Sequence, residues 1–323
     1  MKIAFITEMN FKGKIPGSHE NMRTEFAWMN ALDANHYPIV EYSLVNNYDH
    51  VFVIFPKGIF NLNAVGAKIS NNYNPITELL SQPITATLKQ NNKKVHYIQE
   101  GPNWLFNDYE IVDQFNFYNN LSNCDSIYSH NEYDCKFYQG LFPDKEIKII
   151  PTLLIENLIK DINAQPESKV IIGGNFARWY GGFQSYIVSN ELNAEKWTQE
   201  SHAKRYQENE IDDLNHLPRL NWLQWMKALS TFKYAVHLMP TVAAGTFSLN
   251  CAYFGIPCIG NKNVDTQKIC HPELSVDVND VSKARELAKK LNDKDFYTEC
   301  SNISRENYNK FYNLKEWRKR INL

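Results

Sequence analysis

The sequence lacks any apolar run long enough to cross a membrane. Its longest apolar stretches, such as residues 51–55, have the length of a strand, whereas a spanning helix needs about 20 apolar residues. The first seven residues carry one lysine and a short apolar run that ends before Glu8, which indicates a strand rather than a signal peptide. We therefore expect a cytoplasmic protein without stable membrane insertion.

Cysteine pairs and net charge are also lacking. None of the six cysteines forms a C-x-x-C motif or has histidines at zinc-finger spacing, so neither a structural zinc site nor a disulfide framework is expected. The 34 lysines and arginines nearly balance 36 acidic residues, which gives a formal net charge of −2. Because proteins that work mainly through phosphate attraction are usually basic, contact with nucleic acid would need a local basic patch.

Apolar strand-like runs alternate with helical patterns along the 323 residues, a length that suits two medium domains. The predicted strands are 2–8, 39–44, 50–55, 95–99, 126–130, 147–150, 169–172, 234–239, 257–260 and 275–278. The predicted helices include 21–32, 75–90, 247–254, 282–291 and 295–321, and the predicted linker is 151–169. Because parallel strands need crossover connections, this alternation indicates an α/β fold with doubly wound parallel sheets.

Two glycine-containing loops follow predicted strands and are candidate anion sites, because ligands of open parallel sheets bind beyond the carboxyl ends of the strands. In residues 173–178, GGNFAR, the glycines let backbone N–H groups approach an anion and Arg178 offers a guanidinium to a diphosphate. In residues 243–248, AAGTFS, the start of a helix offers N–H groups and hydroxyls. The alternatives are a tight turn with a surface arginine and an ordinary helix cap.

Two further loops offer groups for acid–base chemistry. Glu100 follows the predicted strand 95–99, where it is either a general base in a partly desolvated cleft or a solvated loop residue. The loop after the first strand carries Lys12, Lys14, Ser18, His19 and Glu20. His19 is a base, a substrate ligand, or a histidine with only a structural or exposed position.

Residues 234–280 resemble the donor half of the GT-B glycosyltransferases. In that family a small-residue turn leads into a helix that ends in Gly-x-Pro before a strand, as in 255–260, GIPCIG. Asn250 stands where many members have a ribose-binding Glu, and Val242 stands where retaining members have a second Glu. The resemblance therefore implies a protein base and an inverting reaction.

Two other segments are similar to the bacteriophage DNA glycosyltransferases that modify hydroxymethylcytosine. These segments are KVIIGGNFARW, at the donor diphosphate in that family, and KVHYIQEGPNWLF, whose strand ends in an acidic base. The resemblance implies two Rossmann-like domains that face a cleft: an acceptor domain 1–160, a nucleotide-sugar donor domain 161–305, and a C-terminal helix 306–323 that packs back on the first domain.

The same resemblance implies the roles of single residues. The diphosphate would be held by Gly173, Gly174, Asn175, Arg178, Gly245, Thr246 and Ser248, and the ribose by Asn250. Glu100 and His19 are the candidate catalytic residues. The acceptor would be contacted by Lys12, Lys14, Ser18, Glu20, Arg23 and Trp104, with Phe106 as a further aromatic. A UDP-sugar would be the co-substrate, with no tightly bound cofactor and no divalent metal.

Three functions stay open from the sequence. The first is transfer of a sugar to a hydroxylated pyrimidine in phage DNA, in the host cytoplasm. The second is transfer to a cell-surface polysaccharide or lipid-linked sugar, for which the basic and aromatic residues 310–321 could contact a membrane surface. The third is a nucleotide-sugar binding protein without catalysis. Neither the sugar nor the oligomeric state follows from the sequence.

Overall fold

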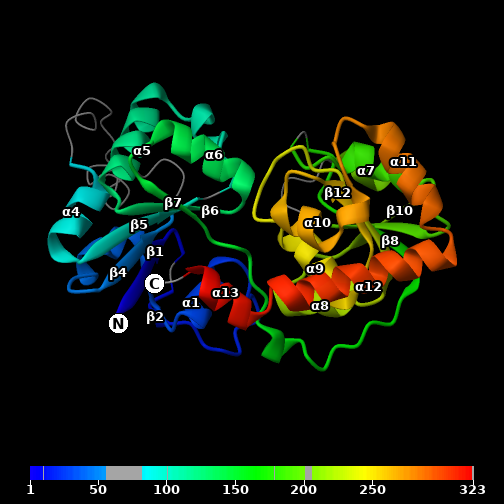
Figure 1. The fold of residues 1–323 in the computed structure, drawn as a ribbon, viewed down its shortest axis with the longest axis horizontal. Coiled ribbons are helices and arrows are strands. Elements are labelled where there is room, and N and C mark those ends of the chain that lie inside the picture. Colours follow the sequence, from blue (N-terminus) through cyan, green and yellow to red (C-terminus); the bar gives the residue numbers. More distant parts are fainter. Residues whose placement is uncertain (10, 56–81, 100, 178, 201–205, 322–323) are drawn as a thin grey trace. The chain divides into compact units, whose positions relative to one another are not determined.

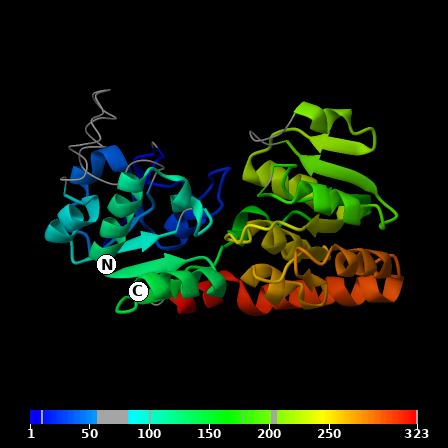
Figure 2. The same ribbon diagram turned by 90° about the horizontal axis from the view of Figure 1, so that it is seen from above.

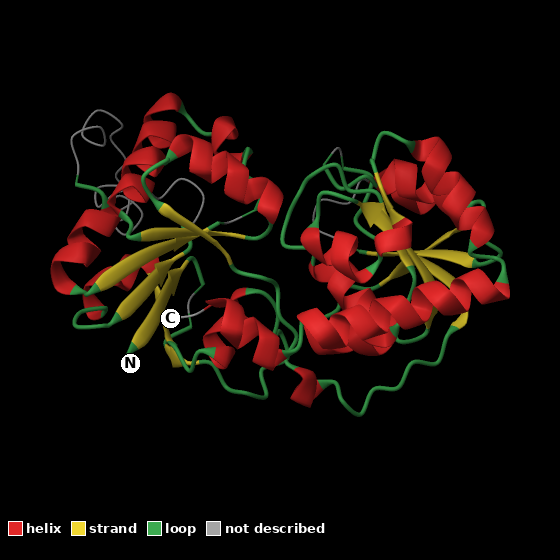
Figure 3. Ribbon diagram, in the orientation of Figure 1, coloured by secondary structure: helices red, strands yellow, loops and turns green. Residues whose placement is uncertain are grey.

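The computed structural model describes residues 1–9, 11–55, 82–99, 101–177, 179–200 and 206–321 (Figure 1). The chain divides into two compact units. The first unit contains residues 1–17 and 25–150, and the second contains 18–24 and 151–323. Each unit has a sheet with helices on both faces (Figure 3), so the predicted α/β fold with two Rossmann-like sheets is confirmed.

The sheet of the first unit has the order β2-β3-β1-β4-β5-β6-β7. Its strands are β1 (Ile3–Thr7), β2 (Gly13–Lys14), β3 (Asn35–Pro38), β4 (His50–Val53), β5 (Lys94–Ile98), β6 (Ser126–Ser129) and β7 (Glu146–Ile149). All neighbours pair in parallel except the short β2, which is antiparallel to β3.

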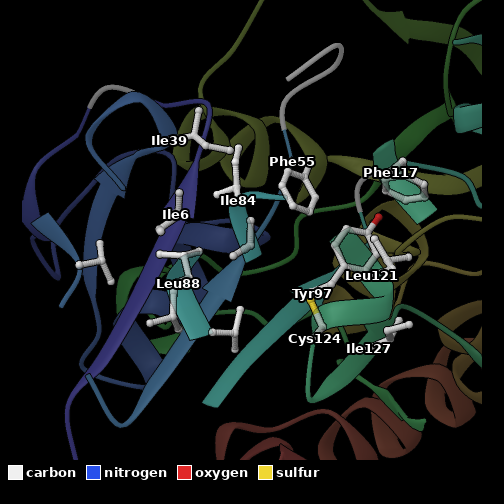
Figure 4. Close-up of a cluster of buried hydrophobic side chains, with 14 of the residues drawn as sticks. Ile6, Ile39, Phe55, Ile84, Leu88, Tyr97, Phe117, Leu121, Cys124 and Ile127 are labelled. Carbon is white, nitrogen blue, oxygen red and sulfur yellow. The ribbon is translucent and has the colours of Figure 1, made fainter. Parts of the chain in front are cut away.

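One face of this sheet packs on helices α4 (Ile84–Asn91), α5 (Ile111–Asn123) and α6 (Glu132–Leu141). Ile6 and Leu88 belong to the resulting cluster (Figure 4), where Tyr97 packs its ring 5.5 Å from that of Phe117. The helix α1 spans Glu25–Ala31. The central strands are buried on both faces, which explains why they read as nearly continuous apolar runs.

The sheet of the second unit has the order β10-β9-β8-β11-β12-β13, and every pair is parallel. Its strands are β8 (Glu167–Ile172), β9 (Glu195–Gln199), β10 (Leu214–Leu217), β11 (Phe232–His237), β12 (Cys258–Asn261) and β13 (Ser275–Val276). This is the classical Rossmann order 3-2-1-4-5-6. The order reverses between β8 and β11, so the loops after these two strands flank the switch point at which ligands bind in such sheets.

The helices of the second unit begin and end at recognisable signals. They are α7 (Gly182–Ser189), α8 (Trp222–Leu229), α9 (Thr246–Phe254), α10 (Asp265–Cys270), α11 (Val281–Lys290), α12 (Lys294–Phe311) and α13 (Leu314–Ile321). Asn221 caps α8 in a capping box with Gln224, and α9 ends at Gly255, whose φ is +69°. The long α12 packs against α9 and α10 (Figure 2).

Several predicted elements are corrected by the structure. Residues 39–44 form a 3₁₀ helix, and the strand lies at 35–38, because Pro38 has no N–H with which to extend the ladder. The predicted helix 295–321 is divided into α12 and α13 at Asn313, whose Oδ1 accepts the N–H of Glu316 at 3.0 Å. The predicted helix 75–90 lies partly outside the described residues and starts, within them, at Ile84 after Pro83.

Two features are absent from the described residues: disulfide bonds and membrane-spanning helices. None of the six cysteines, all of which the structure describes, is in a disulfide, and five are buried. No helix within the described ranges combines the length and apolarity that crossing a bilayer requires.

Residues 18–24 follow the first strand and its loop but belong to the second unit, where they complete the N-terminus of α8. The carbonyl of Glu20 accepts the N–H of Leu223 at 3.0 Å, and Oδ1 of Asn21 accepts the N–H of Trp222 at 3.0 Å. Two of the free N–H groups at the start of α8 are thereby satisfied. This explains why the predicted helix 21–32 begins only at Glu25.

We expect Asn21→Ala to open the first turn of α8. Loss of this side-chain acceptor should cost about 1 kcal/mol, and the amide of Trp222 should exchange hydrogen several-fold faster. Hydrogen exchange measured on peptides that cover 218–226 tests this. Ser18→Ala, at an exposed position of the same segment, is the matched control, and equal exchange in both variants would show that the segment does not cap α8.

We also expect acid to destabilise the protein well above the pKa of its carboxylates. Burial lowers the pKa of His96 to about 3 and that of His130, His237 and His271 to about 4. The unfolded chain, whose histidines have a pKa near ~6.5, binds more protons than the folded protein at intermediate pH. The free energy of unfolding should therefore fall as the pH drops from about 6.5 to about 4.

Thermal melts across this pH range measure the effect. His96→Phe removes one titrating group from a stacked aromatic site beside Phe52 and should give a flatter pH dependence. A melting temperature that stays constant through this range would contradict the burial of neutral imidazoles.

Candidate functional site

A cavity of about 200 Å³ lies at the carboxyl ends of β11 and β12 in the second unit. It is lined by His237, Met239, Thr241, Ala243, Ala244, Gly245, Thr246, Phe247, Ser248, Asn261, Val264 and Gln267. None of these described lining residues is acidic. The position is that of a ligand site in an open parallel sheet.

The first turn of α9 forms one wall of this cavity. Gly245 precedes the helix with φ +74°, and a Cβ on it would lie 2.0 Å from Oγ1 of Thr266. The carbonyl of Gly245 accepts hydrogen bonds from the hydroxyls of Thr266 at 2.8 Å and Ser248 at 3.1 Å. These bonds fix the turn so that the positive end of the helix dipole meets the cavity, which is a favourable arrangement for an anion.

The glycine-rich loop after β8 packs directly on the end of β11. The N–H of Gly173 donates to the carbonyl of Val236 at 2.8 Å, and a Cβ on Gly173 would lie 2.5 Å from the ring of His237. Gly181 has φ +67°, and a Cβ on it would lie 2.0 Å from the carbonyl oxygen of Leu238. The glycines of this loop therefore permit an approach that no side chain would allow.

Asn175 holds the same loop in shape. Its buried side-chain Oδ1 accepts the N–H of Ala177 at 3.0 Å, and its carbonyl accepts the N–H of Gly182 at 3.0 Å. The buried carboxylate of Glu208 accepts the N–H of Phe176 at 3.2 Å. The contacts of Asn175 thus stabilise the turn on which the loop depends.

His237 is a site residue that the sequence reasoning missed. Its ring lies between Gly173 and Phe247, with 4.7 Å between the ring centroids of His237 and Phe247. Burial lowers the pKa of His237 to about 4, so the imidazole is neutral at neutral pH. Its buried Nε2 has no hydrogen-bond partner among the described residues. A polar residue at the last position of a buried strand was the available signal.

The other predicted donor residues are distributed unevenly. Gly245, Thr246 and Ser248 line the cavity, whereas Asn250 does not. With its carboxamide oxygen toward α8, Asn250 accepts from Nε1 of Trp225 at 3.0 Å and donates to the carbonyl of Thr246 at 3.2 Å. Gly174, with φ +78°, lies against Tyr180 in the loop after β8, and Arg178 lies outside the described residues.

The predicted acceptor residues fall into both units. In the first unit Lys12 pairs with Glu41 and Lys14 pairs with Asp33. Trp104 is half-buried and precedes a 3₁₀ helix, Leu105–Asp108, whose Phe106 packs into the aromatic core. Ser18, His19, Glu20 and Arg23 lie in the segment that caps α8 in the second unit, where Nδ1 of His19 accepts the N–H of Asn21 at 3.1 Å.

Glu100, the predicted base, lies outside the described residues, but both of its flanks are fixed. Asp134 at the start of α6 is fully buried. Its carboxylate accepts from Nε2 of Gln99 at 2.8 Å, Nδ2 of Asn103 at 2.8 Å and Nδ2 of Asn131 at 3.0 Å. These hydrogen bonds form a buried polar hub at Asp134, which the sequence did not indicate. The hub holds Gln99 and Asn103 against the start of α6.

The part of the chain that the structure describes contains no obvious set of metal ligands. There, no three or more His, Cys, Asp or Glu side chains are grouped to hold an ion. The cavity instead offers backbone amides, hydroxyls and one neutral imidazole.

Sequence comparisons identify no relative: a scan against protein-family models finds no match, and neither does a comparison with curated proteins. Solved structures do match. An alpha-glucosyltransferase in complex with UDP and a 13-mer DNA containing a HMU base is 12% identical, with a TM-score of 0.60 over 99% of this chain and 97% of that chain.

Two further solved structures have similar scores. Sucrose-phosphate synthase from Thermosynechococcus elongatus is 11% identical, with a TM-score of 0.63 over 100% of this chain and 98% of that chain. TarM of S. aureus is 12% identical, with a TM-score of 0.60 over 87% of this chain and 57% of that chain. These likenesses agree with the sheet orders and with the resemblance read from residues 234–280: the chain has the fold of the GT-B glycosyltransferases.

Proposed function

We propose that this protein is a glycosyltransferase that uses a UDP-sugar donor. The observation that carries the proposal is the cavity at the carboxyl ends of β11 and β12, which has no acidic residue in its described lining and has the N-terminus of α9 in its wall. Such a site suits the diphosphate of a nucleotide-sugar, because amides and the helix dipole stabilise negative charge. The similar alpha-glucosyltransferase was crystallised with UDP, which supports the same class of donor.

The donor would be held from two sides. Gly245, Thr246 and Ser248 present amides and hydroxyls from α9, and Gly173 and Gly174 bring backbone from β8, where Arg178 would add a guanidinium. As the bond between the anomeric carbon and the diphosphate oxygen breaks, negative charge grows on UDP. Fixed amides and a guanidinium stabilise this charge without a metal ion.

Glu100 would act as the general base. In the proposed step it takes the proton of the acceptor hydroxyl, while the acceptor oxygen bonds to the anomeric carbon and UDP leaves, with inversion at that carbon. Support comes from its described neighbours in sequence, because Asp134 accepts hydrogen bonds from Gln99, directly after β5, and from Asn103. His19 is the second candidate, although its Nδ1 already accepts a backbone N–H.

For the acceptor we propose a hydroxymethylated pyrimidine in DNA. Two of the similar structures contain DNA, one with a HMU base and one with an abasic site. A base inside a duplex must leave the stack to reach an enclosed site, and the half-buried Trp104 would receive it. Phosphates would compete with Glu41 for Lys12 and with Asp33 for Lys14, whereas Arg23 is exposed.

A carbohydrate acceptor is the second candidate, because the TarM structure contains alpha-GlcNAc-glycerol and Fondaparinux. The two acceptors differ in charge pattern and size, so a direct assay separates them. The configuration of the product at the anomeric carbon, read by NMR, distinguishes inversion from retention.

The test of function is incubation with a panel of UDP-sugars and either hydroxymethylated DNA, unmodified DNA or glycerol-based glycans. We expect a mass increase only on nucleosides from hydroxymethylated DNA. Glu100→Gln should lower this rate by about 10²- to 10⁴-fold with UDP affinity unchanged, because it removes the base and not the donor site.

Glu110→Gln, at an exposed residue before α5, is the matched control and should keep full activity. UDP binding without turnover of any donor, even by hydrolysis, would reject catalysis. Turnover on glycans alone would reject the DNA acceptor.

The donor site is tested separately with Gly245→Ala. A methyl group there would be strained at positive φ and would collide with Thr266, so the start of α9 must move. We expect the affinity for UDP, measured by calorimetry, to fall at least about tenfold, or ~1.4 kcal/mol. Gly140→Ala is the control, because a Cβ at Gly140 meets nothing within 4 Å. Equal affinities would remove this turn from the donor site.

A further inference from the structure

Several polar side chains in the lining of the cavity are already hydrogen-bonded within the protein. Nδ2 of Asn261 donates to the carbonyl of Met239 at 2.9 Å. Nε2 of Gln267 donates to the carbonyl of Cys258 at 2.7 Å. The hydroxyl of Ser248 donates to the carbonyl three residues earlier at 3.1 Å. A ligand that bonded to these atoms would have to compete with bonds that the folded protein already makes.

His237, which lines the same cavity, differs from these residues. It makes no hydrogen bond within the described part of the chain, and of its two ring nitrogens only Nε2 is buried. A Cβ on Gly173 would lie 2.5 Å from Cγ and 2.6 Å from Cδ2 of this ring. Because Cδ2 is bonded to Nε2, the edge of the ring that packs on the glycine loop carries Nε2. The other edge carries Nδ1, the accessible nitrogen.

This asymmetry decides where the ring proton lies. Burial lowers the pKa of His237 to about 4, so at neutral pH one nitrogen carries a proton and the other is a bare acceptor. A buried N–H without an acceptor is rarer in proteins than a buried acceptor without a donor. The surroundings of an imidazole select its tautomer. The favoured tautomer of His237 therefore has the proton on Nδ1 and leaves the buried Nε2 bare.

The surroundings of His237 also indicate what an N–H at Nδ1 would bind. No acidic side chain belongs to the described lining, so no carboxylate of the lining competes for this proton. The ring lies against Gly173 of the loop after β8, and its centroid is 4.7 Å from that of Phe247 in the first turn of α9. These are the two elements that hold the nucleotide in the proposed function. An N–H donor between them requires an oxygen acceptor on that nucleotide.

We propose that Nδ1–H of His237 donates a hydrogen bond to an oxygen of the bound UDP. The inference rests on the proposed UDP-sugar donor and adds a specificity-determining residue to its site. A phosphate oxygen and a carbonyl of uracil are both suitable acceptors. A carbonyl would also make the site selective for the base, because cytosine has an amino group, itself a donor, where uracil has O4. With either acceptor, His237 gives up no existing hydrogen bond.

The experiment compares His237→Asn with His237→Leu, two side chains of nearly equal shape. In asparagine Nδ2 is bonded to Cγ, as Nδ1 is in histidine, so this variant keeps an N–H donor in place, whereas leucine has none. Calorimetry measures the affinity of both variants and of the unmodified protein for UDP, CDP and uridine. We expect His237→Leu to weaken UDP binding at least about tenfold and His237→Asn to stay within about threefold of the unmodified protein.

The three ligands identify the acceptor. With a uracil carbonyl, His237→Leu should weaken uridine as well as UDP and reduce the preference for UDP over CDP. With a phosphate oxygen, it should weaken UDP and CDP equally and leave uridine unchanged. Equal UDP affinities in the two variants would overturn the inference, because the loss would then follow the ring and not its N–H. Absence of UDP binding by the unmodified protein would instead reject the proposed function, and the inference with it.

A second measurement needs no functional variant. The ¹⁵N NMR spectrum of the histidine rings in the unmodified protein distinguishes a proton on Nδ1 from one on Nε2. We expect His237 to carry it on Nδ1 and this N–H signal to shift when UDP is added. A proton on Nε2, or a signal that UDP leaves unchanged at saturation, would overturn the inference while UDP binding itself stands.

Discussion

The close approach of the loop after β8 to the end of β11 is the constraint on which the candidate site depends. At Gly173 and Gly181 a single methyl group would lie 2.5 Å or less from His237 or Leu238. Repulsion at such distances is steep, so only glycine lets the two strand ends meet. This contact packs the loop after β8 against His237, which belongs to the lining of the cavity.

Two buried polar side chains, Asp134 and His237, respond to burial in different ways. A carboxylate removed from water must be paired or hydrogen-bonded, and Asp134 meets this condition with three side-chain amides. His237 avoids a buried charge in another way. Burial lowers the pKa of its imidazole, so the ring stays neutral. The first arrangement fixes a loop, whereas the second leaves an unpartnered nitrogen at a cavity. Only the second has hydrogen-bonding capacity left for a ligand.

Sequence patterns identified the parts of this structure that depend on local chemistry. Runs such as 169–172 and 234–239 predicted strands because burial on both faces requires apolar residues, and glycine with hydroxyl residues at 243–248 predicted the start of α9. The capping of α8 by 18–24, the 3₁₀ helix at 39–44 and the hub at Asp134 depend on partners distant in sequence, which no local pattern contains. His237 combines the two cases. The sequence indicates that it lies at the end of a strand, but no local pattern indicates that it is buried against Gly173.

Asn250 shows why a family position does not by itself transfer a role. Its carboxamide is buried and engaged by the indole of Trp225 and the carbonyl of Thr246. A ribose hydroxyl that bound Asn250 would have to displace one of these bonds and leave its partner unsatisfied, at a cost of about 1 to 3 kcal/mol. A carboxylate at this position would bring a charge that attracts hydroxyl donors strongly, whereas an amide has no such advantage. Selectivity for the nucleoside is therefore better sought at His237, which lines the cavity and whose Nε2 has no hydrogen-bond partner among the described residues.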